Sequence, residues 1–156
     1  MKVFRTAKQK RIRDLSGFGA SLAGGRWNHI GYRVVYASSS KTLSVLEYLV
    51  HTLSDIIPPN TCYAAIHIPD SASIIEINKS SLPKNWDAFI PINATMDIGT
   101  EWFIKNKSLL LKVPSALIDD EFNILINTNH PEFIKVKLGA VRRWPQIKRY
   151  FPSVPS

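Results

Sequence analysis

Short apolar segments with strand character outnumber helical ones along this chain of 156 residues, and the two kinds do not alternate strictly. Apolar runs bounded by turn residues predict strands over seven segments: 2–7, 34–38, 62–68, 73–77, 109–113, 123–126 and 134–138. Two helices are predicted, one over 41–53 capped by Ser40 or one of its neighbours and one over 95–106 capped by Thr95. A doubly wound parallel sheet requires strict alternation of strands and helices, so this pattern favours an α+β fold.

The length of the chain suits one domain over residues 1–156 with a hydrophobic core of its own. No apolar run reaches the roughly 18 residues that a membrane span needs. The basic start of the sequence contains no apolar signal-peptide segment, so we expect a cytoplasmic protein without a membrane association. The single cysteine, Cys62, has no partner for a disulfide within the chain, and no cysteine cluster indicates a metal site.

Arg26 follows two glycines at the end of a long glycine-bearing loop, after which Arg26 and Trp27 are expected to resume extended structure. Glycines allow close approach of a ligand to the backbone, and a guanidinium suits a phosphate or pyrophosphate. The alternative is a structural arginine that binds loop carbonyls. The sequence contains no P-loop pattern, so Gly-Gly-Arg alone is a weak signal.

Tyr36 and Glu47 are the next candidates. Tyr36 lies in the strand predicted over 34–38, where it can pack in the core or offer an aromatic platform to a flat ring. Glu47 borders the helix face formed by Leu43, Leu46, Leu49 and Val50. A carboxylate there is costly to bury unless it is paired, although Glu47 can also point to water or form a salt bridge.

An arginine, an aromatic ring and a carboxylate together fit the cleavage of an N-glycosidic bond in a dinucleotide such as NAD. The arginine would bind the pyrophosphate and the ring would stack on nicotinamide. The carboxylate would stabilise the positive charge that develops on the ribose as nicotinamide leaves. This reaction needs no metal and no further cofactor, so NAD is expected as a substrate only.

The sequence also resembles the RES domain family, which is named for an arginine, a glutamate and a serine. The resemblance rests on segments spread over nearly the whole chain: GGRWN at 24–28, LSVLEYLVH at 43–51, VFR at 3–5, the 82–86 segment, GTEW at 99–102, VPS at 113–115 and the 123–131 stretch. The naming residues would be Arg26, Glu47 and Ser115, with Tyr36 as a fourth pocket residue beside Trp27 and Asn28. Ser115 can alternatively be a turn serine after Pro114.

Membership of this family implies a fold similar to ADP-ribosyltransferases, with a mixed, split β-sheet core, flanking helices and a cleft for NAD. It also implies the toxin of a bacterial toxin-antitoxin pair. The expected activity is NAD hydrolysis or phosphorolysis, or transfer of ADP-ribose to a protein. The implied partner is a cognate Xre-type antitoxin with a helix-turn-helix, in a complex that can be multimeric, so that DNA is contacted only through the antitoxin.

The distribution of charge supports a second hypothesis. Residues 1–13 and 131–156 each carry six basic side chains and together only one acidic one, whereas the residues between them carry 8 basic and 11 acidic side chains. Aromatic residues lie among the C-terminal cations: Trp144, Tyr150 and Phe151 among Arg142, Arg143, Lys148 and Arg149. A nucleic-acid-binding or RNA-cleaving protein would use such termini, although no known binding motif accompanies them. The same termini could instead dock an antitoxin.

Overall fold

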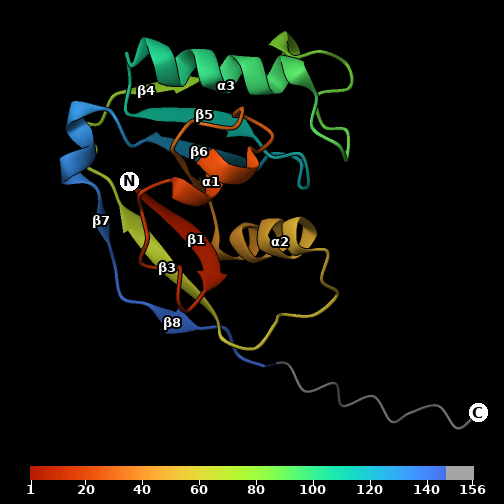
Figure 1. Cartoon of the computed structure of the whole chain (residues 1–156), viewed down its shortest axis with the longest axis vertical. Coiled ribbons are helices and arrows are strands. Elements are labelled where there is room, and N and C mark those ends of the chain that lie inside the picture. Colours follow the sequence, from red (N-terminus) through yellow and green to blue (C-terminus); the bar gives the residue numbers. More distant parts are fainter. Residues whose placement is uncertain (147–156) are drawn as a thin grey trace, which may run out of the picture.

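The computed structural model describes residues 1–146, which form one eight-stranded sheet with helices packed against it (Figure 1). The strands are β1 (Lys2–Lys8), β2 (Val34–Ser38), β3 (Thr61–His67), β4 (Ile74–Glu76), β5 (Leu110–Pro114), β6 (Phe122–Asn127), β7 (Lys137–Leu138) and β8 (Arg142–Arg143). The α-helices are α1 (Phe18–Ala23), α2 (Lys41–Thr52) and α3 (Asn93–Lys105), with short 3-10 turns η1 (Lys79–Ser81) and η2 (Pro131–Lys135).

The sheet consists of two halves joined at one point. Strand order is β4-β5-β6-β2-β1-β3-β7, with β8 also paired to β3. Within each half the strands pair over most of their length, but β1 and β2 share only the pair Phe4 and Ser38. β4 and β5 run parallel, whereas the other neighbours are antiparallel. The sheet is therefore mixed and split, which confirms the predicted α+β class.

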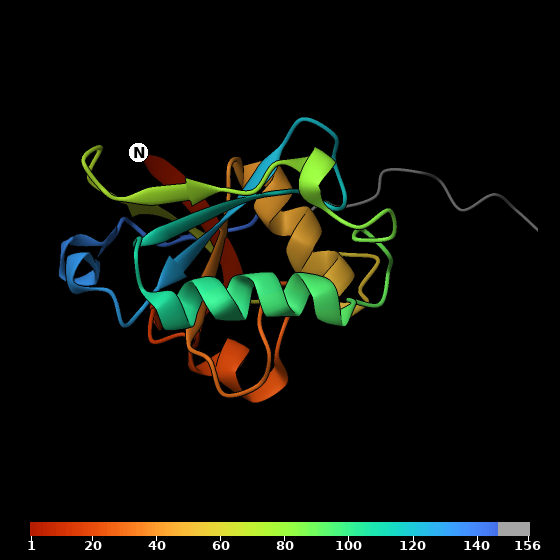
Figure 2. The ribbon, with the colours of Figure 1, turned by 90° about the horizontal axis from the view of Figure 1, so that it is seen from above.

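Alternation along the central strands builds a core on both faces of the sheet. In β6, Ile124 and Ile126 belong to one buried cluster, while Leu125 between them belongs to a second cluster. The second cluster includes Trp102 and Phe103 of α3, so this helix covers the β4-β5-β6-β2 half. Figure 2 shows α3 running along one side of the sheet, and α2 packs instead against β1 and β2. The junction between the halves consequently lies between two helices.

Several predicted elements are confirmed. β2 has the predicted bounds because a β-branched, apolar run ends at three consecutive serines. The third of these, Ser40, caps α2: its Oγ accepts a hydrogen bond from the Leu43 amide at 3.0 Å. This cap fixes the start of α2 and hence the direction in which Glu47 points.

Other predictions were wrong in detail. Arg26 and Trp27 do not resume an extended strand; they form the two central residues of a tight turn closed by Gly25 and Asn28. Thr95 does not cap α3, which begins at Asn93, and its hydroxyl donates to the Ile92 carbonyl instead.

Three further segments differ from the sequence prediction. The loop before Gly24 contains the short helix α1. Of the strand expected over 134–138, only Lys137–Leu138 pairs with β3, because Ile134 and Lys135 belong to the 3-10 turn η2, which has Pro131 in its first turn. β8 was not predicted. Lys148, Arg149, Tyr150 and Phe151 lie outside the described residues.

In the part of the chain that the structure covers, no helix has the length and apolar character that crossing a membrane would require.

Candidate active site

A cleft of about 1040 Å³ opens where the two halves of the sheet separate. Its walls come from β1, β2, α1, α2 and the turn at residues 24–30. Cavities that bind cofactor-sized ligands usually measure about 300–1,000 Å³, so this cleft has room for a dinucleotide. The side chains of Arg26, Tyr36 and Glu47, which the sequence singled out, all line it.

Arg26 reaches from the tight turn to a loop distant in sequence. Its Nη1 donates to the Trp86 carbonyl at 2.8 Å and its Nη2 donates to the Ala88 carbonyl at 2.9 Å. Burial lowers the pKa of the guanidinium, and the nearby charges of Glu47 and Asp87 oppose that shift. The structural role considered from the sequence is therefore present, and the donors that these bonds leave free can bind an anion in the cleft.

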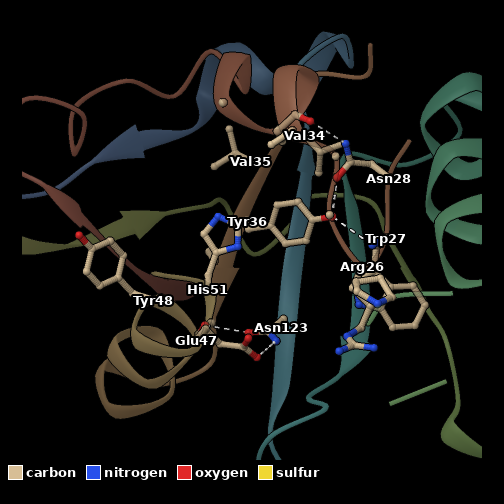
Figure 3. A pocket seen from close by; sticks show the side chains of 18 of the residues that line it. Arg26, Trp27, Asn28, Val34, Val35, Tyr36, Glu47, Tyr48, His51 and Asn123 are labelled. Atoms are coloured by element: carbon tan, nitrogen blue, oxygen red, sulfur yellow. Dashed lines mark hydrogen bonds between the residues drawn. The ribbon is translucent and has the colours of Figure 1, made fainter. Parts of the chain in front are cut away.

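Tyr36 is the centre of a hydrogen-bond network that holds the turn. Its hydroxyl donates to Asn28 Oδ1 at 2.7 Å and accepts a bond from the Trp27 amide at 3.2 Å (Figure 3). Burial raises the pKa of the hydroxyl far above its ordinary value, with the Trp27 bond and the Arg26 charge opposing the shift. Tyr36 therefore stays neutral at physiological pH, and a Cβ on Gly25 would lie 2.7 Å from its hydroxyl, which explains a glycine there.

Trp27 and Asn28 contribute to the shape of the turn more than to the cleft surface. The Trp27 side chain is 2% exposed and packs on Trp86, with ring centroids 6.2 Å apart. Asn28 is fully buried, and its Nδ2 donates to the carbonyls of Ala20, His29 and Tyr32. Both residues thus position the backbone that carries Arg26.

The turn is also held from outside by α3. A Cβ on Gly99 would lie 1.8 Å from the Trp27 carbonyl oxygen, so the helix contacts the turn through its backbone. The next residue, Thr100, accepts a hydrogen bond from the His29 amide at 3.0 Å through its Oγ1. The Gly-Thr pair of α3 therefore fixes the turn that presents Arg26.

Glu47 projects from α2 toward the start of β6. Asn123 Nδ2 donates to Glu47 Oε1 at 2.6 Å, and Ser38 Oγ donates to Asn123 Oδ1 at 2.7 Å. Figure 3 shows Glu47 and Asn123 on one side of the cleft, below the Tyr36 ring and facing the Arg26 side chain. The carboxyl group is thus fixed by a neutral amide, and none of residues 1–146 forms an ion pair with it.

Ser115 is not among the residues of the cleft wall. Its Oγ accepts hydrogen bonds from the amides of Leu117 and Ile118, and its own amide donates to the Glu121 carbonyl. The serine therefore closes the turn between β5 and β6, as the alternative from the sequence describes. The neighbouring residues Pro114 and Ala116 do line the cleft.

Four further cleft residues were missed as candidates in the sequence: Arg5, Tyr48, His51 and Asn123. Arg5 binds the carbonyls of Asp14 and Arg11 through Nη1 and Nη2, and burial lowers its pKa while Asp14 opposes the shift. The Tyr48 hydroxyl is buried without a hydrogen-bond partner in the described part of the chain. Two features of the sequence could have indicated such residues. Arg5 belongs to the VFR segment at 3–5 that contributes to the family resemblance, and His51 lies one helical turn after Glu47.

Within residues 1–146 no three His, Cys, Asp or Glu side chains gather closely enough to hold a metal ion.

Comparison with known proteins identifies the class of this protein. Residues 2–146 match the model of the RES domain. The chain is 37% identical over 145 residues to a protein of Sphingobium sp. (strain YBL2) named Prs ADP-ribosylating toxin, covering 92% of this chain and 90% of that protein. It is 39% identical over 145 residues to Toxin Res of Photorhabdus laumondii, covering 92% and 91%. The chain therefore belongs to the RES domain family of toxins.

A solved structure shares the fold. The crystal structure of the M. tuberculosis MbcT-MbcA toxin-antitoxin complex contains a chain that matches with a TM-score of 0.70 and 15% identity, covering 90% of this chain and 82% of that one.

Proposed function

We propose that this protein is the toxin of a toxin-antitoxin pair and cleaves the bond between nicotinamide and ribose in NAD within the cleft. The observation that carries the proposal is the convergence of a partly free guanidinium, a fixed aromatic ring and a fixed carboxylate on one cavity: Arg26, Tyr36 and Glu47. Both relatives are named toxins, and the name of one of them, Prs ADP-ribosylating toxin, supports chemistry at the same bond.

The roles follow from the charges. The free donors of Arg26 bind the pyrophosphate, with Arg5 as a second cation on the wall of the cleft. The Tyr36 ring, held by its hydroxyl, offers a rigid apolar surface to the nicotinamide ring. Because Tyr36 cannot ionise near neutral pH, it binds and orients the substrate and does not act as a base.

Glu47 supplies the electrostatic step. As the bond from ribose C1′ to nicotinamide breaks, its electron pair passes to the pyridinium ring, which leaves neutral, and the ribose becomes positively charged. The fixed carboxylate stabilises that charge more strongly than it stabilises the ground state, which is the condition for catalysis. A nucleophile then adds to C1′ of the ADP-ribosyl cation. Water gives ADP-ribose and a proton, phosphate gives ADP-ribose with a phosphate on C1′, and a protein side chain gives an ADP-ribosylated protein and a proton.

The rim of the cleft fits a protein partner. Phe18, Ile30, Leu53 and Phe89 line the cleft and are exposed, with Phe89 74% and Leu53 78% accessible. Apolar side chains around a polar centre are typical of protein interfaces. We therefore expect the antitoxin, an Xre-type protein with a helix-turn-helix, to cover this rim.

Nicotinamide release by the purified protein, with and without phosphate, tests the activity and names the acceptor. Nicotinamide release in buffer without phosphate indicates hydrolysis, and release that requires phosphate indicates phosphorolysis. Absence of release in both buffers, together with absence of NAD binding by calorimetry, would refute the proposal. For the partner, Phe89→Ser should weaken inhibition by the antitoxin, whereas Ile104→Ser, on α3 outside the cleft and 63% exposed, should not.

A further inference from the structure

The two basic ends of the described chain meet at one edge of the sheet. β1 and β8 pair with opposite sides of β3, where Cys62 pairs with both Ala7 and Arg143. Strands lie about 4.8 Å apart, so Lys8 and the cations of β8 are separated by about 10 Å. A hydrogen bond of 3.0 Å from Arg143 Nη2 to Gln9 Oε1 ties the segments together. Residues far apart in sequence therefore form one surface.

This surface, here called the basic edge, carries six exposed cations: Lys8, Lys10, Arg11, Arg13, Arg142 and Arg143. Within residues 1–146 none of them forms an ion pair, whereas other cations do pair with carboxylates, as in Lys79 with Asp119 and Lys112 with Glu76. The nearby carboxylate of Asp14 accepts a hydrogen bond from the Ser16 amide. The charge of Asp14 acts on Arg11 among these cations, and most of the positive charge of the basic edge is therefore not neutralised by residues 1–146.

The composition of the basic edge distinguishes between kinds of partner. Arginine is common in protein interfaces too, but their cores also contain apolar or aromatic anchors, and no large apolar side chain is exposed in residues 8–13 or 141–146. Interfaces with nucleic acid are more polar and much more positively charged. Trp144 is also unsuited to stacking on unpaired bases, because it packs on Tyr63 with ring centroids 4.7 Å apart and donates its Nε1 hydrogen to Thr6.

We propose that the basic edge binds the phosphate backbone of double-stranded DNA directly, independently of base sequence. This goes beyond the NAD cleft and differs from the expectation that DNA is contacted only through the antitoxin. The choice of DNA over RNA rests on the proposed function, since a DNA-binding antitoxin would hold the toxin close to a duplex. The existence of the basic edge itself does not depend on the proposed function, because it follows from the exposed cations and from the pairing of β1 and β8 with β3.

Fluorescence anisotropy of the full-length protein with a labelled DNA duplex of mixed sequence, over a series of salt concentrations, tests the proposal. Two double variants remove charges from separate segments of the basic edge: Lys10→Gln with Arg11→Gln, and Arg142→Gln with Arg143→Gln. A matched control, Lys84→Gln with Lys107→Gln, removes two exposed lysines elsewhere that form no ion pair in residues 1–146.

Each phosphate contact contributes about 0.9 to the slope of log affinity against log salt. We expect each basic-edge variant to reduce the slope by about 1.8 and to weaken binding, and the control to bind like the wild type. Absence of salt-dependent binding, an equal loss in the control, or tighter binding of duplex RNA or of polyglutamate than of duplex DNA would overturn the proposal. Nicotinamide release, measured on the same variants, should be unchanged and reports separately on the proposed activity.

Discussion

Replacing Tyr36 with phenylalanine tests the hydrogen-bond network that holds the turn. The variant keeps the aromatic ring but removes the partner of two groups, Asn28 Oδ1 and the Trp27 amide. Asn28 cannot turn its oxygen toward water, because it is fully buried and its Nδ2 is bound to three carbonyls. A buried polar group left without a partner costs about 1–3 kcal/mol.

The two groups together should therefore lower the free energy of unfolding by about 2–4 kcal/mol, after allowing for the removal of the buried hydroxyl itself. Urea denaturation followed by tryptophan fluorescence measures this loss. Tyr32→Phe is the matched control, since the Tyr32 ring packs edge-on against Phe103 and its hydroxyl forms no hydrogen bond within residues 1–146. An unchanged unfolding free energy for Tyr36→Phe would refute the network, and full stability with complete loss of NAD cleavage would assign the hydroxyl to the chemistry instead.

Two further predictions concern the packing of the turn and the acid stability of the fold. Gly99→Ala should destabilise the protein by about 1–3 kcal/mol, because the new Cβ meets the Trp27 carbonyl, although alanine favours helices. Thermal unfolding measures this loss, and Gly19→Ala is the control because its Cβ meets nothing within 4 Å. A loss of similar size in Gly19→Ala would contradict the reasoning. Hydrogen bonds from Ser73 lower the pKa of Glu132 below its ordinary value of 4.5. The stabilisation that ionised Glu132 gives to the folded state is fully present above pH 4.5 and is lost as the pH falls through the lowered pKa. Glu132→Gln should therefore flatten the decline in the free energy of unfolding on acidification. An identical decline in the variant and the wild type would contradict this prediction.

Local patterns were sufficient to predict two of the elements that carry the candidate site, β2 and α2. The run VVYAS and the serines after it define β2 and the cap of α2 without any tertiary information. Tyr36 and Glu47 could therefore be placed on a strand and a helix that follow one another, whereas Arg26, expected in extended structure, lies in a tight turn. All three residues line one cleft, and their roles in it stay predictions.

What the sequence could not predict depends on contacts between distant segments. Asn123 shares a face of β6 with Leu125, but its bond to Glu47 depends on the register of β2 with β6, which pairs Asn123 with Ser38. The strand β8 contains only two residues and exists because β3 has a free edge, which no local pattern indicates. The turn at Arg26 and Trp27 is likewise held by distant segments, through the Tyr36 hydroxyl of β2 and the backbone of α3.

The central claim is that Glu47 stabilises the positive ribose as nicotinamide leaves, and the kinetics of Glu47→Gln test it most directly. The amide is isosteric and can still accept the bond from Asn123, so the fold and NAD binding should be retained while the charge is lost. Removing one such electrostatic group lowers kcat by about 10²–10³. We predict that decrease in nicotinamide release for Glu47→Gln and none for Glu101→Gln, an exposed glutamate of α3 outside the cleft. Release by Glu47→Gln at the wild-type rate would contradict the account.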